Sequence, residues 1–118
     1  MSTEVPEREV RAINEEMMLI EMADGLYEVH GENGNGAYVV DLKGEEPTCT
    51  CPDYRHREPE GGCKHIRRVR IEEGEESVEE LRDRLRERID RLESRASRME
   101  SEAQDLRYTL ESLQEVAE

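Results

Sequence analysis

The chain has 118 residues and a formal net charge of −14, with 41% of its residues charged and only 34% hydrophobic. This length allows one small domain and an extension, and so few apolar residues leave little surface to offset the entropy of folding. The composition therefore excludes a large packed core, and we expect a metal, a disulfide or oligomerisation to stabilise the fold.

The acidic excess of 31 Asp and Glu over 17 Lys and Arg has two interpretations. One is a protein that mimics nucleic acid or binds basic partners, and the other is a surface adapted to high salt. The acidic residues are spread along the chain rather than grouped in one run, which favours the second interpretation. We therefore expect a halophilic protein, and the overall charge says little about its partner.

The cysteines and the apolar runs indicate which compartment we expect for the protein. Three cysteines cannot all pair with one another, and no apolar stretch at the N-terminus is typical of a signal peptide, which argues against a secreted disulfide framework. The longest apolar run is Met17 to Ile20, far short of the roughly 20 residues that a membrane span needs. We expect a soluble cytoplasmic protein with no membrane partner.

The first half of the chain predicts a small antiparallel meander preceded by a helix. Residues 7–18 carry Val10, Ile13 and Met17 at helical spacing, which predicts a short amphipathic helix and an N-terminal segment over 1–16. The turn signal at 23–25 separates two apolar segments, and the second of them alternates like a half-buried strand. A second turn at 32–36 leads into the β-branched and aromatic run 37–42, which predicts a third strand.

The next segment predicts a loop and then a helix. Residues 43–62 contain three prolines and three glycines, which exclude a long regular element and indicate a loop. Residues 63–71 then predict a short helix with Ile66 and Val69 on its inner side, ended by Gly74. We place a compact domain at 17–74.

Residues 75–118 contain no Gly, Pro or Cys, and we expect one long helix. Apolar residues recur at heptad spacing over about six heptads, which predicts a coiled coil that needs a partner helix. The d positions are Val78, Leu85, Leu92, Met99, Leu106 and Leu113, and the a positions are Arg82, Ile89, Ala96, Ala103, Leu110 and Ala117. The predicted fold class is therefore α+β, a small β-hairpin or meander with a short helix, followed by a long coiled-coil helix.

The charges beside this seam favour a parallel homodimer. In that arrangement each g residue meets an e residue of the partner, and all three such pairs are attractive: Arg88 with Glu93, Arg95 with Glu100, and Glu102 with Arg107. The weak a positions leave antiparallel pairing and pairing with a different chain open. A solvated single helix held by intrachain pairs such as Glu87 with Arg91 is a further alternative.

The strongest functional signal is a set of metal ligands in two clips, Cys49-Thr50-Cys51 and Cys63-Lys64-His65. In an extended segment residues i and i+2 face the same side, so Cys49 and Cys51 can point at one ion. Gly61 and Gly62 allow the sharp turn that brings Cys63 and His65 to complete a tetrahedron.

This ligand set predicts one structural zinc ion. Three soft thiolates and one imidazole, with no open position, favour structural zinc over magnesium, calcium or a catalytic zinc. The alternative is three unrelated buried thiols and a surface histidine. His30 and His56 are expected to be surface residues, not ligands.

The two clips resemble the SWIM-type zinc finger, whose pattern is C-x-C, a spacer and C-x-H. Here the pattern reads CTCPDYRHREPEGGCKHI, and GLYEVHG and AYVVDL upstream are similar to the family's hairpin, so the resemblance covers residues 17–71. It implies a DNA-binding or protein-interaction role rather than catalysis. One branch of the family partners RecA-like recombinase paralogues and usually has Ala three residues after the His, whereas this chain has Arg68 there. The chain as a whole more closely resembles the small, acidic, stand-alone SWIM proteins of halophilic archaea.

Basic residues near the clips suggest a nucleic-acid contact. The candidates are Arg55, Arg57, Lys64, Arg67, Arg68 and Arg70, and Tyr54 could stack on a base. The alternative is that these arginines pair with acidic residues at 72–76 and that Tyr54 is an apolar plug under the loop. DNA or RNA is therefore one predicted partner.

A protein that binds residues 75–118, in the first place a second copy of the chain, is the other predicted partner. Both partners are compatible with a non-enzymatic interaction module, because no nucleophile with its base and no phosphate-binding loop stands out and no small-molecule substrate is indicated. A recombination or transcription accessory protein and a zinc or thiol redox sensor are the alternative functions.

Overall fold

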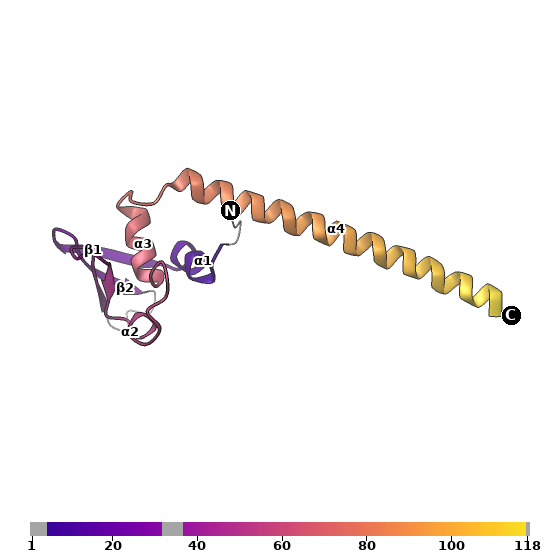
Figure 1. The fold of residues 1–118 in the computed structure, drawn as a ribbon, viewed down its shortest axis with the longest axis horizontal. Coiled ribbons are helices and arrows are strands. Elements are labelled where there is room, and N and C mark those ends of the chain that lie inside the picture. Colours follow the sequence, from indigo (N-terminus) through magenta and orange to yellow (C-terminus); the bar gives the residue numbers. More distant parts are fainter. Residues whose placement is uncertain (1–4, 32–36, 118) are drawn as a thin grey trace. The chain divides into compact units, whose positions relative to one another are not determined.

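The computed structural model describes residues 5–31 and 37–117, so the turn predicted at 32–36 lies outside the described residues. Figure 1 shows the order of the helices and strands. They are α1 (Glu7–Asn14), β1 (Met17–Ala23), β2 (Leu26–Gly31), β3 (Ala37–Asp41), β4 (Thr48–Cys49), α2 (Pro52–Arg57), α3 (Lys64–Glu72) and α4 (Val78–Ala117). The predicted α+β class, with a small antiparallel sheet, short helices and a long C-terminal helix, is confirmed.

The chain forms two compact units. One spans Val5–Leu81, and the other contains α4 from Arg82 onward. Helix α1 belongs to the first unit because it packs against α3. The boundaries predicted after residues 16 and 74 stay predictions, and no local pattern in the sequence shows that the N-terminal helix packs on a helix about 50 residues away.

The sheet of the first unit has the order β1-β2-β3-β4, with antiparallel neighbours throughout. Val29 lies opposite Tyr38, and Val40 lies opposite Cys49, so these residues share the face that is buried. The hairpin and the meander are as the sequence predicts. Strand β4 adds a fourth strand, which carries the first cysteine onto the core face.

The core of this unit is small and contains all three cysteines. Ile66 and Val69 of α3 pack against the sheet, as their spacing predicts. The eight buried residues of the cluster are Tyr27, Val29, Val40, Cys49, Cys51, Cys63, Ile66 and Val69. The candidate metal ligands are therefore part of the core and are not attached to its surface.

Helix α1 differs from its prediction in both length and orientation. It ends at Asn14, and Met17 begins β1 instead of continuing the helix. Its buried residues are Glu9 and Ala12, whereas Val10 and Ile13 are 37% and 40% exposed. The prediction that the apolar residues of this helix form its inner side is thus wrong. Glu9 turns inward instead, because it has a partner elsewhere in the chain.

That partner is Arg67 of α3. Its Nη1 lies 2.6 Å from Oε2 of Glu9, and the two side chains are only 13% and 4% exposed. The same guanidinium donates to the carbonyl oxygens of Gly62 and Glu60, each at 2.9 Å. One partly buried arginine therefore joins α1 to α3 and to the turn before Cys63.

Residues 43–62 are not only a loop. They contain the two-residue β4 and the six-residue helix α2, which begins with Pro52 directly after Cys51. A proline at the first position of a helix with an acidic residue after it is a common helix start, so Pro52 and Asp53 were the signal that could have predicted α2.

The second unit is the remainder of α4, whose apolar residues are largely exposed. Ile89, Leu92, Met99, Leu106, Leu110 and Leu113 are all at least 43% exposed. Across the part of the chain that the structure describes, every helix is too short or too polar to cross a membrane.

The buried pair between Arg67 and Glu9 gives a first prediction. Arg67→Met keeps an apolar stem but leaves the Glu9 carboxylate buried without its cation, and we expect the free energy of unfolding to fall by about 3–5 kcal/mol. Chemical denaturation of the full chain measures this loss. Arg55→Met, at an exposed arginine of α2, should change stability by less than about 0.5 kcal/mol. A loss at Arg67 of no more than about 1 kcal/mol, as for surface ion pairs, would contradict the prediction.

Candidate metal centre

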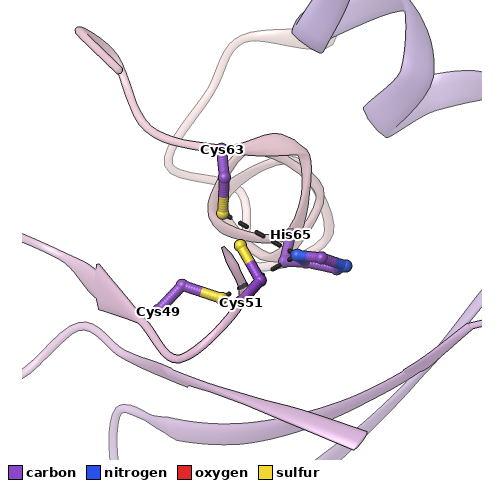
Figure 2. Close-up of side chains that lie close together, drawn as sticks. All are labelled: Cys49, Cys51, Cys63 and His65. Carbon is purple, nitrogen blue, oxygen red and sulfur yellow. Dashed lines mark hydrogen bonds between the residues drawn. The ribbon is translucent and has the colours of Figure 1, made fainter. Parts of the chain in front are cut away.

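The structure brings the four predicted ligands together. One donor atom from each of Cys49, Cys51, Cys63 and His65 lies within 4.8 Å of all the others, and all four residues are buried. Figure 2 shows the sulfur atoms and the imidazole ring turned toward a common centre. These residues could hold a metal ion, as the spacing of the two clips indicates.

The first clip is fixed by hydrogen bonds to β3. The N–H of Thr50 donates to the carbonyl of Val39 at 3.1 Å, and the N–H of Val39 donates to Thr50 Oγ1 at 2.9 Å. Thr50 faces outward, so Cys49 and Cys51 on either side of it face the core. Cys51 also caps α2, because its Sγ accepts the N–H of Tyr54 at 3.4 Å.

The second clip depends on the two glycines before it. Gly61 and Gly62 have φ of +84° and +94°, a conformation that other residues rarely adopt. A Cβ on Gly62 would also lie 2.9 Å from Cγ2 of Ile66. The predicted sharp turn is present, and it places Cys63 at the N-terminus of α3 with His65 in the first turn.

The distances between donor atoms test whether an ion fits. Nδ1 of His65 lies 3.8 Å from Sγ of Cys49 and 3.8 Å from Sγ of Cys63. A tetrahedral ion with metal–sulfur bonds near 2.3 Å and metal–nitrogen bonds near 2.0 Å separates sulfur from nitrogen by about 3.5 Å. The site is thus close to the size that zinc needs, and its donors are those that zinc prefers.

Without a metal ion the three thiols interact strongly with one another. A hydrogen bond from Cys49 lowers the pKa of Cys63 to about 4. The same hydrogen bond, together with burial, raises the pKa of Cys49, and burial raises the pKa of Cys51. The negative charge of the metal-free site is therefore concentrated on Cys63, at the N-terminus of α3.

Basic residues from three helices surround the site. A cavity of about 270 Å³ is lined by three of the candidate ligands, Cys51, Cys63 and His65. Its charged lining comprises Arg8 and Arg11 of α1, Asp53 and Arg57 of α2, and Lys64 of α3. Sequence analysis missed Arg8 and Arg11, because they precede the first ligand by about 40 residues and only the packing of α1 brings them here.

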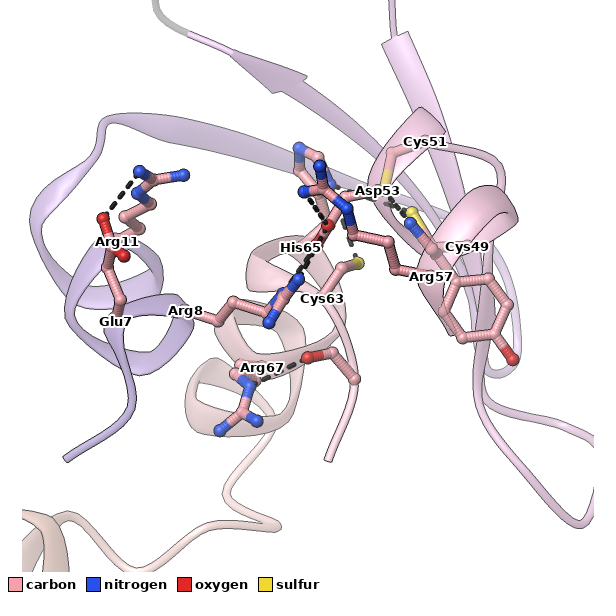
Figure 3. A network of polar contacts seen from close by, with 12 residues as sticks. Glu7, Arg8, Arg11, Cys49, Cys51, Asp53, Arg57, Cys63, His65 and Arg67 are labelled. Atoms are coloured by element: carbon pink, nitrogen blue, oxygen red, sulfur yellow. Dashed lines mark hydrogen bonds and ion pairs between the residues drawn. The ribbon is translucent and has the colours of Figure 1, made fainter. Parts of the chain in front are cut away.

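Arg8 is held firmly at the edge of this cavity. Its Nε and Nη2 donate to the two carboxylate oxygens of Asp53 at 2.8 and 2.9 Å, as Figure 3 shows. This hydrogen-bonded pair lowers the pKa of Asp53. Arg57 shares the same carboxylate, at 3.5 Å.

The predicted nucleic-acid contacts are spread over different environments. Arg67 is held by Glu9, and Arg68 donates to the carbonyl oxygens of Ala12 and Glu15 at the end of α1 and to the carboxylate of Glu72. These two arginines therefore fasten α1 and α3 together.

Of the other candidates, Lys64 pairs with Glu15 at 2.5 Å, and Arg70 lies 3.6 Å from Glu75. Arg55 and Arg57 are exposed on α2. Tyr54 packs against the core cluster, as the alternative interpretation of this residue predicts.

Comparisons with protein-family models, curated proteins and solved structures found no match to this chain. The likeness to SWIM-type zinc fingers therefore rests on the spacing of the ligands and on the hairpin before them.

The thiol environment predicts how metal binding depends on pH. Cys49 and Cys51 have raised pKa values and carry protons near pH 7, whereas Cys63 does not. Zinc must displace those protons, so its apparent affinity should rise with pH, and fewer than three protons should be released per ion. Calorimetric titration in buffers of different ionisation enthalpy counts the protons. Release of three protons, or an affinity that does not change between pH 6 and pH 8, would contradict this, because the raised pKa values keep Cys49 and Cys51 protonated across that range before the metal binds.

Proposed function

We propose that this chain is a non-enzymatic, zinc-binding interaction module of the SWIM type, joined by α4 to a protein partner. The observation that carries the proposal is the buried cluster of three cysteines and one histidine in the centre of the core.

A structural role for the zinc follows from the surroundings of the ligands. Four protein donors satisfy a tetrahedral ion and leave no position for a substrate or water. The three cysteines are at most 4% exposed, so the ion would be enclosed. Burial of the sulfur atoms also gives a redox-sensing role less support, since oxidation favours accessible thiolates.

The SWIM assignment is supported by the combination of motif and position. The C-x-C clip follows an antiparallel meander, and the C-x-H clip opens a helix that packs on that meander. The resemblance implies binding rather than catalysis, and no nucleophile with its base stands out in the sequence.

Helix α4 supports a protein partner. Its seam residues Leu92, Met99 and Leu106 are 43%, 61% and 64% exposed, which is a large apolar stripe for so charged a chain. Such a stripe is stable in water when a second helix covers it. A second copy of the chain is the simplest partner, because the three parallel g-to-e pairs are all attractive.

A nucleic-acid contact has less support than a protein contact. Arg67 and Arg68 are occupied in joining α1 to α3, and Lys64 and Arg70 lie beside carboxylates. A phosphate backbone would have to compete with these internal partners, and strong salt weakens such binding further.

A matched pair of histidine substitutions tests the zinc site. Purified protein should contain one zinc per chain by elemental analysis, and His65→Asn should lose it on dialysis together with the circular dichroism of the folded domain. His56→Asn, at an exposed histidine of α2, should retain both. Equal zinc content in the two variants, or a wild-type protein without stoichiometric zinc, would refute the site.

A second matched pair tests α4. Leu92→Glu with Leu106→Glu places charges in the seam, and we expect sedimentation of the full chain to change from dimer to monomer at micromolar concentration. Ser94→Glu with Ser101→Glu adds the same charge at f positions and should leave the dimer intact. If the wild-type chain sediments as a monomer, or if both variants behave alike, self-association through the seam is wrong.

A further inference from the structure

One face of the sheet carries exposed apolar side chains on β1. Met18 and Ile20 are 62% and 45% exposed, and they lie opposite His30 and Glu28 of β2. Val29, between those two residues of β2, is fully buried and belongs to the core cluster. Since successive residues of a strand point to opposite faces, the apolar side chains of β1 project from the face of the sheet that is turned away from the core.

Strand β1 is also the edge of the sheet. Its one neighbour among the described strands is β2, so a row of its backbone N–H and C=O groups faces away from the sheet. The register is regular from Met17 to Glu21 and shifts between Glu21 and Ala23. Lys and Pro, which commonly protect such edges, do not occur in this strand. The regular part of β1 can therefore accept one further strand of about five residues.

The charge around this edge is negative. Residues 12–42 contain no Lys or Arg, and His30 is the one side chain among them that can become positive. Glu16, Glu21 and Asp24 lie directly before, within and after β1, and all three are exposed. The carboxylates of residues 12–42 are those of Glu15, Glu16, Glu21, Asp24, Glu28, Glu32 and Asp41.

Cations from other segments at the two ends of β1 do not reverse this charge. Arg68 lines a cavity together with Met18, but its guanidinium is bound by the carboxylate of Glu72. Lys43 lines another together with Asp24, and two further carboxylates of residues 73 and 75 border the same space. A segment that pairs with β1 therefore meets an apolar strip with carboxylates along it.

We propose that β1 is a docking edge for an extended segment of a partner protein, with apolar residues at alternate positions and Lys or Arg beside them. Backbone hydrogen bonds to β1 would supply affinity, and the alternate apolar side chains would cover Met18 and Ile20. The flexible side chain of Met18 adapts to different apolar neighbours. This surface adds to the proposed function a second contact, separate from the seam of α4, and it requires the folded domain.

A basic partner fits this edge better than the other available occupants. Two β1 strands from two copies of the chain would bring their carboxylates together without a Lys or Arg in the paired segments, and like charges across strands are destabilising. A helix such as α4 cannot pair along the edge, because its backbone groups are already bonded within the helix. An extended basic segment satisfies both the free backbone groups and the charge.

Selection from a phage-displayed library of random peptides of about ten residues, on the immobilised full chain, tests the proposal. We expect enriched peptides to have apolar residues at alternate positions and a net positive charge. A fluorescent synthetic copy of an enriched peptide should bind Ile20→Thr about 5-fold to 10-fold more weakly than wild type, because buried apolar surface is lost. Ile13→Thr makes the same change on α1, where the side chain is 40% exposed, and should bind as wild type.

Two altered peptides test the mode of binding. A copy with Glu in place of its Lys and Arg should not bind, because it meets carboxylates. Copies N-methylated at alternate residues, one for each set of positions, remove the N–H groups of one peptide edge at a time, and one of the two should fail to bind. Hydrogen exchange of the full chain should slow at the amides of β1 when the unmodified peptide is added.

Several results would overturn the docking edge. They are a library that enriches no peptide, an enriched peptide that binds Ile20→Thr as tightly as wild type, and one that binds equally well in its Glu form. If Ile20→Thr makes the free chain sediment as a smaller species, the edge is covered by a second copy and the basic partner is wrong.

The zinc content and the α4 variant separate this inference from the proposed function. A chain that holds one zinc and fails to bind peptide overturns the docking edge alone, whereas a chain without zinc refutes the zinc module itself. Leu92→Glu with Leu106→Glu should bind the peptide as wild type does, because the changes lie on α4. Loss of peptide binding in that variant would place the contact on α4 and overturn the docking edge.

Discussion

The fold places four candidate metal ligands inside the hydrophobic core, and the rest of the domain packs around them. Three of the eight buried residues in the central cluster are cysteines, and the others are one tyrosine and four aliphatic residues. Five such side chains are few for a domain that must also offset the entropy of ordering its backbone. Zinc binding contributes an apparent 10–16 kcal/mol in zinc-finger peptides, about as much as the entire stability of an ordinary domain. A bound ion at this position would therefore decide whether the domain folds at all.

The features that sequence predicts well are those with local signals. The ligand spacing, the glycine turn before Cys63 and the inner side of α3 each follow from residues close together in the chain. The side of α1 that packs inward does not, because it depends on Glu9 meeting Arg67, 58 residues away. An acidic residue on a short helix is normally exposed, so only the position of its partner explains its burial. Helix α2 is a different case: its start signal, Pro52 and Asp53, was present, but the surrounding prolines and glycines concealed it.

The arginines show that a run of basic residues in the sequence need not form a basic surface in the folded domain. The run from Arg55 to Arg70 predicts a basic surface when it is read along the chain. In the folded domain, Arg67 and Arg68 bind acidic groups and carbonyl oxygens of α1, and Arg8 from α1 comes to the metal site instead. Residues that are far apart in the sequence can pair in this way because the strength of an ion pair depends on the distance between the charges in space.

Cysteines in the core would also make the folding of this protein depend on the supply of metal in the cell. If the proposed zinc ion completes the core, a newly made chain would have only a partial core before the ion binds, and the concentration of folded protein would follow the supply of free metal during synthesis. A shortage of metal would leave the apolar strands exposed, and proteases would then degrade the unfolded chain without any separate metal sensor. The abundance of the module, and of whatever assembles on it, would then be adjusted by metal at the step of folding.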